Sequence, residues 1–186
     1  MAEQWPPTFC RSNPCPTIPQ GKFTIHGLWP SNQTSLQSSK CVTKDPHLQS
    51  FNKAMISTLE AQLNLSWPNL KGQSNELFWA YEWNKHGVCS SNMFNQTQYF
   101  ELAQNIWSRY DIFDILKQQG ISPRTNVWYP TNDIRRAITN HIGAIPQIHC
   151  VNNELLEIRM CLDQSGIKYM TCPKLGNCKN NVLWQP

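Results

Sequence analysis

Eight cysteines in a chain of 186 residues constrain the fold more than any other feature of this sequence. They stand at positions 10, 15, 41, 89, 150, 161, 172 and 178, and none forms the C-x-x-C pair that is typical of structural zinc sites and redox centres. An even number without metal-type spacing predicts four disulfides, which persist in oxidising compartments. We therefore expect a secreted, extracellular protein.

Three sequons agree with export, because Asn-x-Ser/Thr triplets are acceptors for N-glycans. They begin at Asn32, Asn64 and Asn95. The first residues lack the apolar stretch of a signal peptide, since Met1-Ala2-Glu3 runs directly into Gln-Trp-Pro-Pro. We interpret the chain as a trimmed mature protein in which residues 1–3 are an added start.

One domain over residues 1–186 is the simplest organisation. A chain of this length buries roughly 70% of its unfolded surface, which is sufficient for a single core. We find no internal repeat or low-complexity segment, and no window approaches the roughly 20 apolar residues of a membrane span. The net charge of +4 favours approach to a polyanion, but the dense Lys/Arg runs of many nucleic-acid binders are absent from the sequence.

The order of the predicted elements favours an α+β fold. Residues 22–29 alternate as a strand does, which places His26 opposite Phe23 and Ile25. Apolar residues at helical spacing predict helices over 45–63, 97–119 and 132–142, the last two ended by Gly120 and Gly143. Residues 154–163 and 167–172 read as a strand hairpin. We expect a central, mainly antiparallel sheet with several packed helices and four disulfides.

The stretch FWAYEWNKHGVC, residues 78–89, combines core-type and ionisable side chains. Wound as a helix, it presents Glu82, Lys85 and His86 on one face at spacings of three and four, while Trp79 and Trp83 share a neighbouring face. A surface ion pair between Glu82 and Lys85, and a histidine at the helix dipole, would explain the same residues without any chemistry. The second histidine, His26, shifts the balance towards an active site.

Two histidines and a lysine suit the cleavage of RNA through its own 2′-OH. One imidazole can take the 2′-OH proton while the other protonates the departing 5′ oxygen. A lysine can neutralise charge on the phosphorane, so that neither a metal nor another cofactor is needed. A metal-dependent nuclease is the enzymatic rival, but the sequence lacks a carboxylate cluster for magnesium. A disulfide-stapled recognition protein with little catalysis is the alternative from another class.

Three segments resemble the ribonuclease T2 family and occur in the family's order. They are QWPPTFC at 4–10, FTIHGLWP at 23–30 and FWAYEWNKHGVC at 78–89. The resemblance implies His26 as general acid and His86 as general base, with Glu82 and Lys85 stabilising the pentacovalent transition state. It also implies the disulfides Cys10–Cys15, Cys41–Cys89, Cys150–Cys178 and Cys161–Cys172.

The same resemblance extends to substrate-binding positions. Tyr81 stands where many members carry a third histidine that binds phosphate. Gln4, Asn69 and Phe78 match residues that line a base site in plant relatives, whereas Lys71 replaces an apolar residue there and leaves base preference open. Trp29 and Trp67 are interpreted as packing residues, and His47, His141 and His149 as structural or surface histidines without metal-ligand spacing.

Having only two active-site histidines and a basic pI, the chain is most similar to the plant S-RNases, the self-incompatibility ribonucleases of the pistil. This resemblance implies a monomeric glycoprotein that binds RNA and is recognised by pollen S-locus F-box proteins, with allele-variable surface around residues 32–72. A stress-induced or phosphate-scavenging S-like ribonuclease shares the same motifs and is the alternative role.

Overall fold

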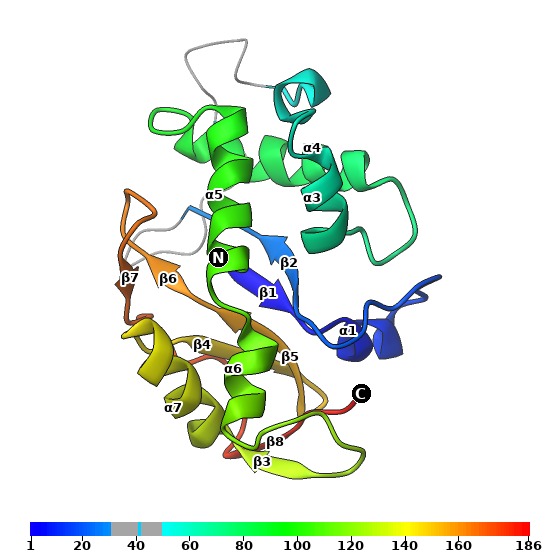
Figure 1. The fold of residues 1–186 in the computed structure, drawn as a ribbon, viewed down its shortest axis with the longest axis vertical. Helices are drawn as coiled ribbons and strands as arrows, with labels where there is room; N and C mark the ends of the chain where they lie inside the picture. Colours follow the sequence, from blue (N-terminus) through cyan, green and yellow to red (C-terminus); the bar gives the residue numbers. More distant parts are fainter. Residues whose placement is uncertain (31–40, 42–49) are drawn as a thin grey trace.

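A six-stranded sheet forms the centre of the computed structural model, which describes residues 1–30, 41 and 50–186 (Figure 1). The strand order is β2-β1-β5-β8-β3, and β4 pairs with β5 beside this path. All pairs are antiparallel except β5 with β8, so the predicted α+β class with a mainly antiparallel sheet is confirmed. The strands are β1 (Ala2–Gln4), β2 (Thr24–Gly27), β3 (Trp128–Pro130), β4 (Gln147–Val151), β5 (Glu154–Arg159) and β8 (Asn181–Leu183).

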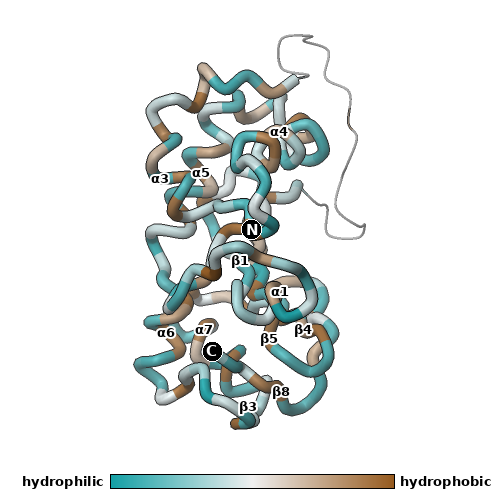
Figure 2. Tube along the Cα trace, turned by 90° about the vertical axis from the view of Figure 1, so that its right-hand side faces the viewer, coloured by the Kyte–Doolittle hydropathy of each residue, from teal (hydrophilic) through white to brown (hydrophobic). Residues whose placement is uncertain are grey.

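Helices cover one face of this sheet and extend beyond its β2 edge. In Figure 1, α5 and α6 run across the front of the sheet, while α3 and α4 lie above β2. Figure 2 shows the same division from the side, with α3 and α4 at one end, β3 and β8 at the other, and β1 between them. The helices are α1 (Pro6–Ser12), α3 (Glu60–Ser66), α4 (Asn75–Lys85), α5 (Gln96–Arg109), α6 (Ile112–Gln118) and α7 (Thr131–Ile142), with 3₁₀ turns η1 (Lys53–Ile56) and η2 (Gly87–Ser90).

The core lies between the sheet and α5–α7 and is rich in aromatic residues. Trp5 packs against Phe23 and Trp184, with ring centroids 5.1 and 5.2 Å apart, and stacks on Phe113 of α6 at 5.9 Å. The Trp5 indole also donates a hydrogen bond to the Gln185 carbonyl at 2.7 Å. One residue of the amino-terminal segment thus ties both chain ends to the helical layer. No described helix is long and apolar enough to cross a membrane.

The helix predicted over 97–119 is wrong as a single element. It is interrupted at Tyr110 and Asp111, both of which have extended backbone, and continues as α6. The Asp111 carboxylate accepts a hydrogen bond from the Asp114 amide at 3.1 Å and so begins a second helix. The apolar spacing continues through the break because α5 and α6 each bury an apolar face. The helix over 132–142 is confirmed as α7, which ends at Gly143 with φ +73°.

The helix predicted over 45–63 begins outside the described residues and is not continuous where the structure describes it. Asn52 has extended backbone and caps the short turn η1 by accepting from the Ala54 amide at 3.0 Å. The regular helix α3 begins only at Glu60. A side-chain cap therefore divides a segment that the apolar periodicity alone presents as one helix.

The predicted carboxyl-terminal hairpin is only partly present. Cys161–Leu162 (β6) pairs with Tyr169–Met170 (β7), but β5 joins the central sheet and pairs with β4 and β1 instead. Residues 1–3, interpreted above as an added start, are part of this sheet: Ala2–Gln4 forms β1 between β2 and β5. The strands β1, β3 and β8 have three residues each, which is too short for a strand periodicity to be recognised in the sequence.

Four disulfides join the pairs that the family resemblance implies, and no described cysteine is free. The bond Cys41–Cys89 closes the largest sequence separation, 48 residues, and Cys10–Cys15 the smallest, 5 residues. Cys89 lies in η2, three residues after His86. The largest loop is therefore closed beside the carboxyl end of α4.

We predict unequal losses of stability when these two disulfides are removed. In the chain-entropy model, Cys41→Ser with Cys89→Ser should lower the free energy of unfolding by about 4 kcal/mol, and Cys10→Ser with Cys15→Ser by about 2 kcal/mol. Denaturant unfolding of the two double variants checks this. Equal losses would show that loop length does not determine the contribution of these bonds.

Candidate active site

Strand β2, which carries His26, lies at the edge of the sheet, and three aromatic side chains bind its backbone. The Trp67 indole donates to the His26 carbonyl at 3.1 Å, the Trp107 indole to the Phe23 carbonyl at 2.9 Å, and the Tyr99 hydroxyl to the Leu28 carbonyl at 2.7 Å. Phe23 and Ile25 are buried, while the His26 side chain on the opposite face is one-third exposed. The backbone position of His26 is therefore fixed from both sides of the strand.

Helix α4 brings the second group of predicted residues to β2. Ser74 caps its start by accepting from the Leu77 amide at 3.4 Å, and Trp79 and Trp83 are buried in the core. His86 is the carboxyl-terminal cap, and its amide donates to the Glu82 carbonyl at 2.9 Å. The predicted helix in FWAYEWNKHGVC is confirmed, with its tryptophans in the core.

Trp29 lies between the two histidines. Its ring centroid is 5.0 Å from that of His26 and 5.7 Å from that of His86, and its indole donates to Glu82 Oε2 at 2.8 Å. This side chain, interpreted from the sequence as packing only, joins β2 to α4. The structure therefore brings His26, Glu82 and His86 together around one indole.

Glycine at position 27 makes this close approach of β2 and α4 possible. A Cβ there would lie 2.1 Å from Trp29 Nε1 and 2.4 Å from Glu82 Oε2, inside the contact limits of both atoms. Any side chain would separate the indole from the carboxylate. The glycine after His26 is thus required by the neighbouring side chains.

Two residues that the sequence analysis did not identify lie behind His26, on β5. His26 Nδ1 forms a short hydrogen bond with Glu157 Oε1, and Arg159 binds Glu157 Oε2 through Nε at 2.8 Å and Nη2 at 2.6 Å. A carboxylate can only accept, so Nδ1 carries the proton and Nε2 is left for a substrate. The Arg159 guanidinium also lies 5.1 Å from the Trp29 ring centroid. The only signal in the sequence was that Glu157 and Arg159 stand two residues apart in a predicted strand and therefore share a face.

The two buried carboxylates of the site titrate in opposite directions. Burial alone would raise the pKa of Glu157, but its bonds to His26 and Arg159 outweigh this and lower the pKa to about 2. Burial raises the pKa of Glu82, and the Trp29 hydrogen bond only partly counters it. Glu157 is thus held as a carboxylate, whereas the charged form of Glu82 is disfavoured.

Lys85 and Tyr81 lie at the outer side of α4. Lys85 Nζ donates to the Tyr81 hydroxyl at 2.7 Å and lies 4.9 Å from the centre of its ring. Tyr81 is 53% exposed, and Lys85 is half-buried. The predicted phosphate-binding position is therefore coupled to the predicted catalytic lysine, one helical turn away.

The predicted base-binding residues differ in their surroundings. Gln4 is buried in β1, Phe78 is half-buried against the core, and the Asn69 side chain closes its own loop by accepting from the Lys71 amide at 3.1 Å. No side-chain hydrogen bond joins these three in the described part of the chain. Their role stays a prediction.

Of the other histidines, His141 lies on α7, where it contacts the Ala137 carbonyl at 2.9 Å. His149 on β4 is the cross-strand partner of Glu157, and burial and the nearby Arg159 lower its pKa. His47 and Asn32 lie outside the described residues. Asn64 and Asn95 are exposed, as glycan acceptors must be. Among the residues that the structure describes, no group of three or more His, Cys, Asp or Glu could hold a metal ion.

Comparison with known proteins agrees with this geometry. A model of the Ribonuclease T2 family matches residues 1–172. Ribonuclease S-7 from Nicotiana alata is 34% identical over 183 residues, which cover 95% of this chain and 81% of that relative. Ribonuclease MC from Momordica charantia is 33% identical over 193 residues, covering 99% and 97%. The solved structure of ribonuclease MC1 from bitter gourd seeds superposes with a TM-score of 0.87 at 31% identity, covering 98% of this chain and 96% of that one.

We predict that Glu82→Gln stabilises the protein. The amide oxygen can still accept from Trp29, while the buried charge is removed, so the free energy of unfolding at pH 7 should rise by roughly 0.5–2 kcal/mol. Because the pKa of Glu82 is raised in the folded state, folded protein binds more protons above about pH 4.5, and the gain should grow as pH rises through this range. Denaturant unfolding at several pH values measures it.

Glu101→Gln, at an exposed position on α5, is the matched control and should change stability by less than about 0.5 kcal/mol. A Glu82→Gln variant less stable than the parent at neutral pH would contradict the stated balance of burial and hydrogen bonding.

Proposed function

Because this chain belongs to the ribonuclease T2 family and is an endoribonuclease, we propose that it cleaves single-stranded RNA without a metal ion, through a 2′,3′-cyclic phosphate. The observation that supports this mechanism best is the position of two histidines on either side of Trp29, one on β2 and one at the end of α4. We infer that a phosphodiester bound beside Trp29 exchanges protons with both histidines.

In this mechanism His86 takes the proton of the 2′-OH, whose oxygen attacks phosphorus, and His26 gives a proton to the departing 5′ oxygen. Glu157 supports the second role, because a carboxylate that accepts from Nδ1 turns Nε2 to the substrate. DNA lacks the attacking 2′-OH and would not be cleaved.

Charge on the phosphorane is neutralised by cations at both sides of the site. Lys85 extends from α4, and Arg159 from β5 over the Trp29 ring. Glu82 is proposed to act in the transition state as a hydrogen-bond donor, since its raised pKa makes the protonated carboxyl accessible. Tyr81 carries no positive charge at neutral pH and contributes a hydrogen bond at most.

We predict that His26→Ala and His86→Ala each lower kcat by about 10²- to 10⁴-fold, the usual contribution of general acid or base catalysis. Cleavage of a defined RNA oligonucleotide, with 2′,3′-cyclic products identified by mass spectrometry, measures the loss. His141→Ala, on the exposed end of α7, is the matched control. EDTA should not change the parental rate; abolition of cleavage by EDTA would refute the metal-free mechanism.

We predict that Glu157→Gln lowers kcat by less than the about 10²- to 10⁴-fold expected for His26→Ala, while the Michaelis constant changes little. An amide can donate as well as accept, so it no longer holds the proton on Nδ1 and no longer turns Nε2 to the substrate. Steady-state rates for a dinucleotide substrate measure kcat and the Michaelis constant separately. An unchanged kcat would show that Glu157 does not orient the His26 ring.

For the biological role, we propose the pistil S-RNase of gametophytic self-incompatibility, a secreted glycoprotein recognised by pollen S-locus F-box proteins. Support comes from Tyr81 in place of a histidine, and from the similarity to ribonuclease S-7 and to the SF11-RNase of Nicotiana alata, which is described as self-incompatibility associated. Much of the expected allele-variable surface at 32–72 lies outside the described residues.

An S-like stress or phosphate-scavenging role is the competing proposal, because relatives include ribonucleases of both compartments, extracellular ribonuclease LE and intracellular ribonuclease LX of tomato. Expression confined to styles, with alleles that differ strongly at residues 32–72, would support the pistil role. Expression throughout starved leaves would contradict it.

A further inference from the structure

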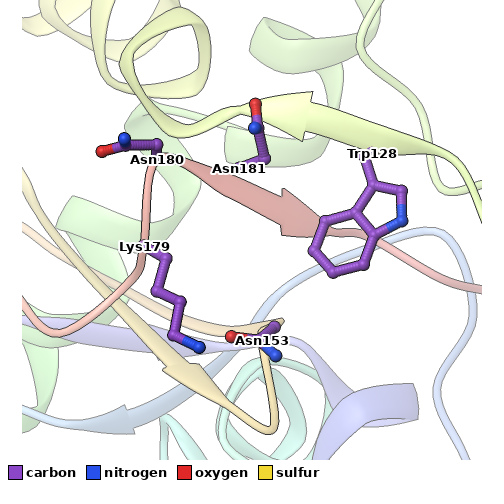
Figure 3. A pocket seen from close by; sticks show the side chains of 5 residues that line it. All are labelled: Trp128, Asn153, Lys179, Asn180 and Asn181. Atoms are coloured by element: carbon purple, nitrogen blue, oxygen red, sulfur yellow. The ribbon is translucent and has the colours of Figure 1, made fainter.

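A second polar cavity lies away from the histidines, at the opposite edge of the sheet. It has a volume of about 580 Å³ and is lined by Trp128, Asn153, Lys179, Asn180 and Asn181 (Figure 3). Trp128 is 52% exposed although it lies in a strand. A large indole left in water on an edge strand has no packing role that explains it.

The backbone of this cavity is fixed, while its side chains are unpaired. The Asn153 and Asn180 carbonyls accept from the amides of Leu183 and Thr131, each at 2.9 Å, and Asn153 has φ +64° in the β4–β5 turn. In contrast, no described residue forms a hydrogen bond or ion pair with the side chains of the three asparagines or of Lys179. The backbone therefore fixes where these four polar side chains begin, and their polar ends remain available to a ligand.

This cavity opens on the same face of the sheet as His26. Successive strand residues point to opposite faces. Ile25, Ile158 and Val182 are fully buried in the core, so their neighbours His26, Glu157 and Asn181 project from the other face. Tyr129 packs against the core, and Trp128 beside it therefore also projects away from it. One face of the sheet thus carries His26 on β2 and Trp128 on β3, at the two ends of the strand order.

We propose that this cavity, the Trp128 subsite, binds a nucleotide of the single-stranded RNA whose phosphodiester lies at His26 and His86. The indole offers a stacking surface for a base, Lys179 an ammonium for a phosphate, and the three carboxamides hydrogen bonds to base edges or ribose. No carboxylate lines the cavity, so nothing there repels the polyanion. The proposal rests on RNA cleavage between the two histidines and adds a remote contact that only longer substrates reach.

RNA is favoured over a neutral oligosaccharide by position and charge. An exposed indole with amides would suit either ligand, but Lys179, which pairs with no described residue, and a sheet face shared with His26 favour the RNA substrate. The subsite would make the enzyme prefer long single strands, because one chain can then contact both edges of the sheet.

The test measures binding of uncleavable RNA, in which 2′-O-methyl groups block the nucleophile, to the folded full chain. For an oligonucleotide of about 15 residues, Trp128→Ala should raise Kd by about 5- to 10-fold, the lower part of the range for loss of one base–aromatic stack. Trp128→Phe should restore most of the affinity. Lys179→Ala should reduce the slope of log Kd against log salt by about 0.7, as expected for one phosphate contact on a single strand.

Two controls separate this proposal from the catalytic one. β2 and β3 are four strand positions apart, about 19 Å at roughly 4.8 Å per strand, so a dinucleotide at His26 should not reach Trp128. Its affinity should therefore be the same in parent and Trp128→Ala. Leu175→Ala removes an apolar side chain of similar exposure, 53%, outside the cavity and should leave binding of both RNAs unchanged. If the parent binds both RNAs but cleaves neither of their unmodified forms, the catalytic proposal fails while the subsite can still be measured.

Photocrosslinking locates the contact directly. With 5-iodouracil in the long oligonucleotide, trypsin should release the crosslink on residues 125–135, a peptide whose aromatic residues are Trp128 and Tyr129. Unchanged affinity of Trp128→Ala for the long RNA, or protection of Trp128 by a neutral oligosaccharide and not by RNA, would overturn the proposal.

Discussion

The hydrogen bonds from aromatic side chains to the outer edge of β2 are the interactions on which the rest of the site depends. An edge strand leaves carbonyl groups without partners, and such groups require donors when they are covered by other elements. Here Trp67 at the end of α3, and Tyr99 and Trp107 of α5, supply these donors. They satisfy the strand and also fix the distance between β2 and the helices. His26 therefore has a defined backbone position although its strand has a neighbour on one side only.

From this fixed strand the site is assembled across the sheet and towards α4. Across the sheet, β1 separates β2 from β5, and its Gln4 pairs with Thr24 on one side and Glu157 on the other. The Glu157 carboxylate bonds to His26 Nδ1, so this contact reaches across the width of β1. Towards α4, the absence of a side chain at Gly27 allows Trp29 to reach Glu82. The polar contacts around His26 thus depend on the pairing of β1 and on one glycine.

The sequence predicted the parts of this site that lie within continuous segments. His26 on a strand, and Glu82 and His86 on one helix, follow from periodicity within a few residues. The Glu157 contact does not, because it depends on β1 pairing with both β2 and β5, and β1 is a three-residue strand without a readable pattern. Helix breaks at Asn52 and Asp111 were missed for a related reason: a single capping side chain outweighs an apolar spacing that continues through it. Disulfide pairing came from the family resemblance, since eight cysteines alone allow 105 pairings.

Two buried carboxylates near His26, Glu82 on α4 and Glu157 on β5, have pKa values shifted in opposite directions. Glu157 has a lowered pKa, so its ion pairs stabilise the folded state above about pH 4.5, and this contribution is lost as pH falls towards 2. Glu82 has a raised pKa, so its burial destabilises the folded state in the pH range where Glu157 contributes most. His26 and Arg159 explain the difference, because both bind Glu157, whereas Glu82 accepts its hydrogen bond from the uncharged Trp29. A fold selected for stability alone would pair both carboxylates or remove them. In the proposed mechanism the unpaired carboxyl group holds a proton for the reaction, and the paired one, behind His26, orients the ring.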